Sequence, residues 1–209
     1  MGLTDFQKQN FLRVISNYYG LSQTQLILEL GIEVKNTIPK NIRYLIAQSI
    51  LKTHEKDEKV CNENTKLKTL RINEKNTVLE SMSFSQIKYE EIINQSWENS
   101  DLYKILSSEF IIFIFKIKNK DDKNPIFCCA KFWKMDLADL DFANKFWELT
   151  KENVRIGDYN NFISIKNNFI CHVRTKGLNN RDAMKTPQGT LEPKRGFWLN
   201  ASYLKTQLF

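Results

Sequence analysis

Basic and aromatic side chains gather in two short segments near the end of the chain. Arg174 and Lys176 are spaced by two residues in a predicted strand, so their side chains point to one face of it. Residues 194–198 then combine two bases, a glycine that permits close backbone approach, and two aromatic residues. Basic groups neutralise phosphates, and Arg or an aromatic edge reaches base edges in a groove. The pattern permits a nucleic-acid contact, but composition alone favours a solvated basic loop whose aromatic residues anchor the last helix.

A second segment of interest, residues 66–70, lies where predicted helices give way to strands and carries Lys66 and Lys68. Such a lysine pair favours DNA phosphates or is simply exposed. The chain has 2 histidines, too few for a Ser-His-Asp set or a His-rich metal site. His172, beside Arg174, is therefore expected to have a structural or phosphate-contacting role rather than to transfer protons.

The charge is concentrated towards the C-terminus. The formal net charge of the 209 residues is +7, and residues 170–209 hold seven bases and two acids, a net charge of +5. This excess permits a nucleic-acid partner without establishing one. Hydrophobic residues make up 42% of the chain, which excludes a wholly disordered protein. The length favours a single domain, residues 1–209.

The cysteine spacing and the length of the apolar runs indicate in which cellular compartment the protein works. No CxxC spacing occurs, and the adjacent Cys128 and Cys129 suit neither a metal clip nor an ordinary disulfide. The start lacks the layout of a signal peptide, and the longest apolar run, 110–115, is far short of the ~20 residues that span a bilayer. We expect a soluble cytoplasmic protein with no membrane partner.

The elements that must position these residues follow from periodicity and capping signals. The sequence predicts an α+β (mixed α/β) fold, with a helical subregion over residues 1–55 and a mixed sheet flanked by helices, together with the basic block, over 66–209. The predicted elements are helices over 6–20, 22–31 and from about 39 to 51, a helical stretch opening at Ser85, strands at 109–118, 126–133 and 169–174, a helix of about 15 residues after Asp136, and a terminal helical segment over 197–209.

Two motifs resemble those of a known family, the GATC-recognising endonucleases that include the mismatch-repair nuclease MutH and the Sau-type restriction enzymes. Residues 173–176, Val-Arg-Thr-Lys, resemble the family's I-R-P-K strand, with Thr175 in place of the proline. Residues 195–200, Arg-Gly-Phe-Trp-Leu-Asn, resemble the element that leads into the family's last helix. Residues 81–84 and 170–174 look most like the C-terminal half of the Sau-type enzymes.

The resemblance implies a MutH-like restriction-endonuclease fold and double-stranded DNA as the partner. In the family, the C-terminal half of the Sau-type enzymes binds a second GATC site as an effector without cutting, beside a catalytic MutH-like domain or subunit. It implies that Trp198 lies against the recognition bases. The residues expected to contact DNA are Arg174, Lys176, Lys194, Arg195, Trp198 and His172.

The resemblance also indicates that the nuclease site is degenerate. Cleavage in the family depends on carboxylates that hold Mg²⁺ and on a nearby lysine. Alignment of the family's E-L-K-T on residues 66–69 keeps the lysine as Lys68, but puts Lys66 at the metal-binding glutamate, Lys59 at the aspartate and Gln48 at the helix glutamate. A divalent ion does not bind where its ligands are replaced by positive charge, because the Coulomb energy changes sign. We therefore expect no catalytic residue and no metal cofactor.

Two alternatives stay open. One is an active Mg²⁺-dependent, site-specific deoxyribonuclease of the same family that uses Glu58, Glu63 and Lys68 in a shifted geometry. The other is a protein-interaction module that keeps the fold and turns its basic face to an acidic partner.

Overall fold

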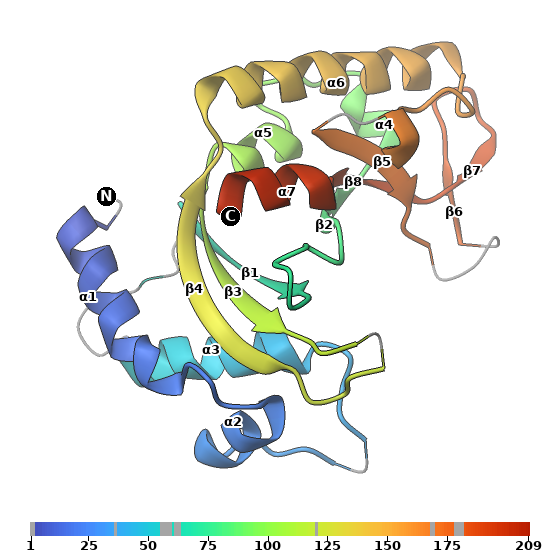
Figure 1. The fold of residues 1–209 in the computed structure, drawn as a ribbon. Helices are drawn as coiled ribbons and strands as arrows, with labels where there is room; N and C mark the ends of the chain where they lie inside the picture. The colour runs from blue at the N-terminus through green and yellow to red at the C-terminus, as the bar shows by residue number, and fades with distance from the viewer. Residues whose placement is uncertain are drawn as a thin grey trace. The chain divides into compact units, whose positions relative to one another are not determined.

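The structure, a computed structural model, is of the mixed α+β class, as predicted, and its ribbon divides into two compact units (Figure 1). Unit 1 comprises Met1–Leu79, Ser108–Lys134 and Leu208–Phe209, and unit 2 comprises Glu80–Ser107 and Met135–Gln207. The prediction of a single domain is left untested by this division. The described residues are 3–35, 37–54, 60, 64–119, 121–167, 170–177 and 182–209.

Unit 1 places a cluster of helices on one face of a mixed sheet. The strand order is β1-β3-β4, with β1 parallel and β4 antiparallel to the central β3. Its elements are α1 (Asp5–Ile15), the 3₁₀ turn η1 (Ser16–Tyr18), α2 (Gln23–Glu29), α3 (Ile42–His54), β1 (Thr65–Ile72), β3 (Glu109–Lys116) and β4 (Ile126–Lys134).

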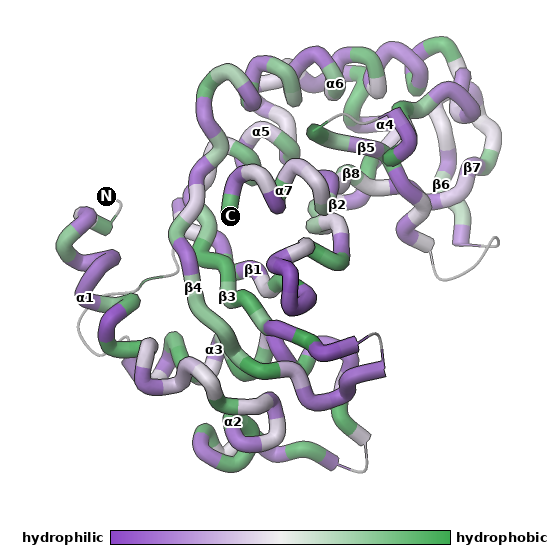
Figure 2. The backbone as a smooth tube through the Cα atoms, viewed as in Figure 1, coloured by the Kyte–Doolittle hydropathy of each residue, from purple (hydrophilic) through white to green (hydrophobic). Residues whose placement is uncertain are grey.

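Local signals explain these elements. At the start of α2, the Ser22 side chain accepts from the backbone N–H of Gln25, and the Gln25 side chain accepts from the backbone N–H of Ser22, which together form a capping box. Strand β3 is continuously apolar (Figure 2), and its residues 110–115 are all 0% exposed. Phe113 stacks on Phe127 of β4, with ring centroids 5.2 Å apart. Burial on both faces of β3 therefore confirms the interpretation of its unbroken apolar run.

Unit 2 is built around an antiparallel sheet of order β2-β8-β5, with a separate hairpin of β6 and β7. The aromatic ring of Phe146, on α6, meets that of Phe197, on β8, edge to face at 5.8 Å, so α6 covers one side of this sheet. The elements are β2 (Met82–Gln86), α4 (Tyr89–Ile92), α5 (Asp101–Leu106), α6 (Leu137–Ile156), the 3₁₀ turn η2 (Ile165–Asn167), β5 (Cys171–Thr175), β6 (Ala183–Lys185), β7 (Leu191–Pro193), β8 (Arg195–Leu199) and α7 (Ala201–Leu208).

Two segments of unit 2 differ from the prediction. Ser85, expected to open a helix, lies in β2, and residues 197–199, expected to be helical, belong to β8; the last helix begins only at Ala201. Ser83 of β2 pairs with Trp198 of β8, a partner so distant along the chain that local periodicity does not reveal it. The helix after Asp136 is confirmed but spans 20 residues rather than about 15.

The predicted strand over 169–174 is present from Cys171, and Phe169 lies outside the described residues. No helix in the described part of the chain is long and apolar enough to cross a membrane.

Candidate nucleic-acid interface

Register within the sheet of unit 2 determines which side chains share a face. His172 and Ser83 both lie opposite Trp198, and Arg174 and Gln86 both lie opposite Gly196. Residues directly opposite in neighbouring strands point to the same side of a sheet. We call this side the polar face, defined by Ser83, Gln86, His172, Arg174, Lys176, Gly196 and Trp198.

The opposite face of the same strands is apolar. Met82, Cys171, Val173, Phe197 and Leu199 are all buried. Strand alternation thus separates a packing side from a polar side, as the spacing of Arg174 and Lys176 predicted.

An aromatic and cationic stack forms the centre of the polar face. The rings of His172 and Trp198 are nearly parallel, with an interplanar angle of 19° and centroids 6.3 Å apart. The guanidinium carbon of Arg174 lies 5.4 Å from the centroid of the Trp198 ring, within the range of a cation–π interaction. Arg174 is exposed. The indole therefore holds a cation that is open to solvent and able to meet an anion or a base edge.

His172 is the buried member of this stack. It is 1% exposed, and its Nδ1 is hydrogen-bonded to Oδ1 of Asn200, which leads into α7. Burial lowers the pKa of His172, the Asn200 hydrogen bond opposes this, and the charge of Arg174 lowers it further. The imidazole is thus held neutral, and its depth favours a supporting role for Trp198 over a phosphate contact.

Gly196 makes room for the side chain of Lys176. A Cβ at position 196 would lie 2.8 Å from Cδ of Lys176 and 3.0 Å from the carbonyl oxygen of Ser85. The lysine stem crosses β8 at this point, and its ammonium donates to the carbonyl of Phe84, beside an irregularity in the β2–β8 pairing. Although much of this side chain is exposed, burial lowers the pKa of Lys176. Gly196 therefore permits the close approach of the Lys176 side chain to the backbone of β8.

The remaining two predicted cations are engaged elsewhere. Arg195 lies on the opposite face of β8 by alternation; its guanidinium donates to the carbonyl of Tyr159 at 2.8 Å and lies 5.0 Å from the ring centroid of Phe162. Lys194, just before the strand, forms an ion pair with Asp182. The structure therefore brings Arg174, Lys176, Trp198 and His172 together and places Arg195 apart from them.

Sequence reasoning missed the contribution of β2. Ser83 and Gln86 join the polar face only through their register with β8, and the helix expected from Ser85 obscured this. The signal was the alternation of Met82 and Phe84, both buried, with more exposed neighbours.

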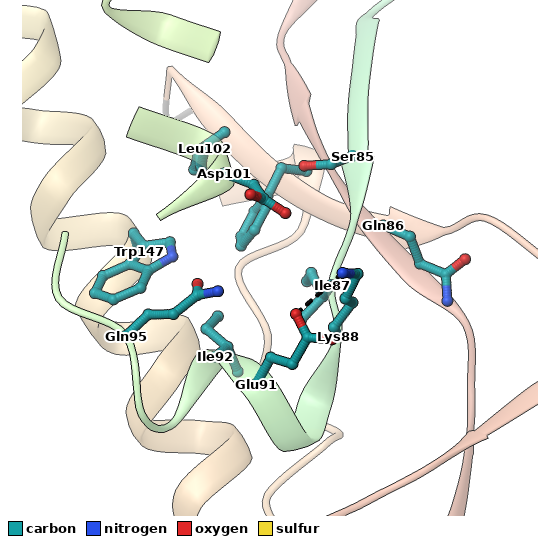
Figure 3. A pocket seen from close by; sticks show the side chains of 11 residues that line it. Ser85, Gln86, Ile87, Lys88, Glu91, Ile92, Gln95, Asp101, Leu102 and Trp147 are labelled. Atoms are coloured by element: carbon teal, nitrogen blue, oxygen red, sulfur yellow. Dashed lines mark hydrogen bonds and ion pairs between the residues drawn. The ribbon is translucent and has the colours of Figure 1, made fainter. Parts of the chain in front are cut away.

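A small pocket lies on the other side of β8 (Figure 3). Its walls include Phe197, Trp147 and Ile92, and the ion pair between Lys88 and Glu91, with Nζ and Oε2 3.0 Å apart, stands at its rim. Six of the eleven lining residues are polar or charged, so the lining does not favour an apolar ligand over a polar one.

The positions that the sequence resemblance assigns to the family's metal ligands lie in unit 1. Lys66 and Lys68 are half-buried on β1, opposite Phe110 and Ile112 of β3, whereas Leu67 points to the helical core. The lysines therefore lie on the face of this sheet away from the helices. Gln48 is half-buried on α3, which packs against β1. Lys59, Glu58 and Glu63 lie outside the described residues.

These residues do not fit a divalent cation. Among the described residues, no group of three or more His, Cys, Asp or Glu side chains could hold a metal ion. Lys66 and Lys68 bring positive charge and no carboxylate to β1, and Mg²⁺ takes oxygen ligands. No step of metal-assisted cleavage is therefore assigned to them.

Comparison with known proteins finds similarity to one family model and to one curated enzyme. Residues 52–144 match the family model of the DNA mismatch repair enzyme MutH, a stretch that includes β1, β3 and β4. The chain is also 29% identical over 194 residues to the type II restriction enzyme Sau3AI of Staphylococcus aureus, an alignment that covers 77% of this chain and 39% of the relative. The chain is thus similar to the MutH and Sau-type enzymes, as its motifs indicated, and spans about two fifths of the length of the curated relative that it matches.

Proposed function

We propose that the chain is a MutH-like domain that binds double-stranded DNA at a GATC-type site through its polar face, with a degenerate nuclease site. In this role it acts as the allosteric effector part of a type II restriction–modification system. Its DNA-binding residues are Arg174, Lys176 and Trp198, with His172 positioning Trp198 and Lys194 at the margin; Arg195, on the opposite face of β8, is not among them.

The observation that carries this proposal is the stack of Arg174 on Trp198 on an otherwise polar sheet face. An exposed guanidinium held over an indole presents fixed donors to phosphates and to guanine edges without a large loss of side-chain entropy on binding. Similarity to a type II restriction enzyme supports DNA as the ligand. The lysines on β1 support binding without cleavage, because they attract phosphates and repel the metal.

Affinity measurements test the recognition step. At moderate salt, we expect a GATC duplex to bind about 1,000-fold or more tightly than a scrambled duplex of equal length. Equal affinity for both duplexes would contradict sequence recognition. Weak, sequence-blind binding with little salt dependence would favour the protein-interaction alternative, because real phosphate contacts release counterions and give a steep salt slope.

A cleavage assay tests the degenerate site. The purified chain, incubated with a GATC-containing plasmid and Mg²⁺, is expected to leave the plasmid supercoiled. Nicking that persists through purification and disappears in Glu63→Ala would establish the nuclease alternative instead. The same variant must keep the wild-type affinity for the duplex, so that loss of nicking is not loss of binding.

The effector role has a separate test. A ligand shifts an assembly only by its difference in affinity for the two states. Mixed with a catalytic MutH-like domain, the chain is expected to accelerate cleavage when a short GATC duplex is added, and a scrambled duplex should not do so. If the added GATC duplex does not change the cleavage rate, the effector role is contradicted, and the chain remains a DNA-binding domain without this regulation.

A further inference from the structure

Gln86 occupies the same row of the polar face as Arg174. Both residues lie opposite Gly196, one on each side of β8. The pairing is irregular between Ser83 and Gln86, and an extra residue in a strand re-aims the side chains that follow it. Gln86 is one of the residues that line the pocket behind the sheet, but Figure 3 shows the amide end of its side chain turned away from the other lining side chains. Gln86 therefore belongs to the side that carries Arg174.

The amide of Gln86 is weakly engaged. The hydrogen bond that the structure gives it is from Nε2 to the sulfur of Met184 at 3.7 Å, and a thioether is a weak acceptor. The residue is half-buried. An amide in this state loses little when it exchanges this contact for a better partner.

The spacing of Gln86 and Arg174 suits a single groove of DNA. Neighbouring strands lie ~4.8 Å apart, so side chains two strands apart are separated by roughly 10 Å at their bases. The major groove of B-DNA is about 12 Å wide. Gly196 between them has no side chain, and the stem of Lys176 crosses β8 at this point with its ammonium at the carbonyl of Phe84, so a third cation lies between Gln86 and Arg174 on this face.

We propose that Gln86 is a specificity-determining residue that hydrogen-bonds adenine in the major groove, while Arg174 contacts a guanine or a phosphate beside it. A carboxamide has a donor and an acceptor side by side, and these match N7 and N6 of adenine in a bidentate contact. This inference rests on the proposed recognition of a GATC-type duplex and names the side chain that distinguishes its A·T pairs.

The test compares Gln86→Met, which keeps the length of the side chain and removes its amide, with the matched control Gln207→Met, on the exposed side of α7. In Gln86→Met, the ratio of affinities for GATC and scrambled duplexes is expected to fall about 5- to 30-fold. Affinity for the scrambled duplex, the salt slope and the unfolding midpoint should stay at wild-type values, and Gln207→Met should change none of these.

A modified duplex tests whether Gln86 contacts N7 of adenine. Replacement of adenine by 7-deazaadenine removes the N7 acceptor, so the wild type should lose affinity for GATC by several-fold, whereas Gln86→Met should lose nothing further. An unchanged ratio in Gln86→Met, an equal 7-deazaadenine penalty in both proteins, or an equal loss on both duplexes would overturn the inference. A wild type that does not discriminate the duplexes at all would overturn the proposed function, and this inference with it.

Discussion

The two three-stranded sheets differ in what their faces are available to do. The central strand of the β1-β3-β4 sheet is buried on both faces, with Phe110 and Phe113 pointing to opposite sides and both 0% exposed. The central strand of the β2-β8-β5 sheet buries Phe197 on one side and leaves Trp198 half-buried on the other. A sheet that is buried on both faces contributes to the core, whereas a face that is partly open to solvent, with Arg174 and Lys176 exposed, is available to bind a ligand. We therefore expect β3 to contribute mainly to stability and β8 to the proposed recognition of DNA.

The largest expected effect is on stability at β3. Phe113→Ala should lower the free energy of unfolding by about 3–5 kcal/mol, because it leaves a cavity beside Phe127. Denaturant unfolding measures this, with Leu149→Ala, 55% exposed on α6, as the near-neutral control. Trp198→Ala should cost clearly less. Equal costs for Phe113→Ala and Trp198→Ala would break the distinction between the two central strands.

The next effect is on recognition at β8. Arg174→Ala should weaken GATC binding about 10- to 100-fold, because it removes the cation that the Trp198 ring holds. The matched control Arg155→Ala removes an exposed arginine that pairs with Glu152 on α6 and should leave the affinity unchanged. Fluorescence anisotropy with labelled duplexes measures both. An Arg155→Ala loss as large as that of Arg174→Ala would show that general charge, not the polar face, governs binding.

A smaller and qualitatively different effect is expected at β1. The double variant Lys66→Ala, Lys68→Ala should weaken binding of GATC and scrambled duplexes by the same factor and reduce the salt slope by about 1–2, because lysines that contact phosphates carry no sequence information. Lys75→Ala, at an exposed turn, is the control. A selective loss of GATC affinity would transfer part of the recognition to unit 1.

The smallest effect concerns pH. Burial, opposed by the Asn200 bond and reinforced by Arg174, gives His172 a lowered pKa in the fold. The unfolded chain therefore binds a proton that the folded chain does not, below the ordinary histidine pKa of about 6.5. The contribution of His172 to the free energy of unfolding is therefore fully present above about pH 6.5 and is lost as the pH falls below it. Thermal unfolding between pH 7.5 and 5 should show this decline, and His172→Gln should make the curve flatter. An identical pH profile in that variant would contradict the assignment.

Prediction from the sequence succeeded where the signal is local. The apolar run of β3, the capping box of α2 and the Asp136 cap of α6 each lie within a few residues of the element that they define. Prediction failed around Ser85, because β2 is a strand only through its pairing with β8. The sequence prediction also grouped Arg195 with its neighbours Lys194 and Gly196. Alternation along β8 places the Arg195 side chain on the opposite face of the sheet.

The sequence by itself determined the α+β class and the strand that carries Arg174, and its resemblance to a known family predicts lysines where a nuclease needs carboxylates. Composition and short-range spacing specify these properties, since each depends on residue types and on the period of a helix or strand. Only the tertiary structure decided that Trp198 contacts both His172 and Arg174, that Gly196 makes room for Lys176, and that Gln86 shares their face. These contacts join strands far apart along the chain, and register between such strands is set by packing of the whole sheet, which no local pattern encodes.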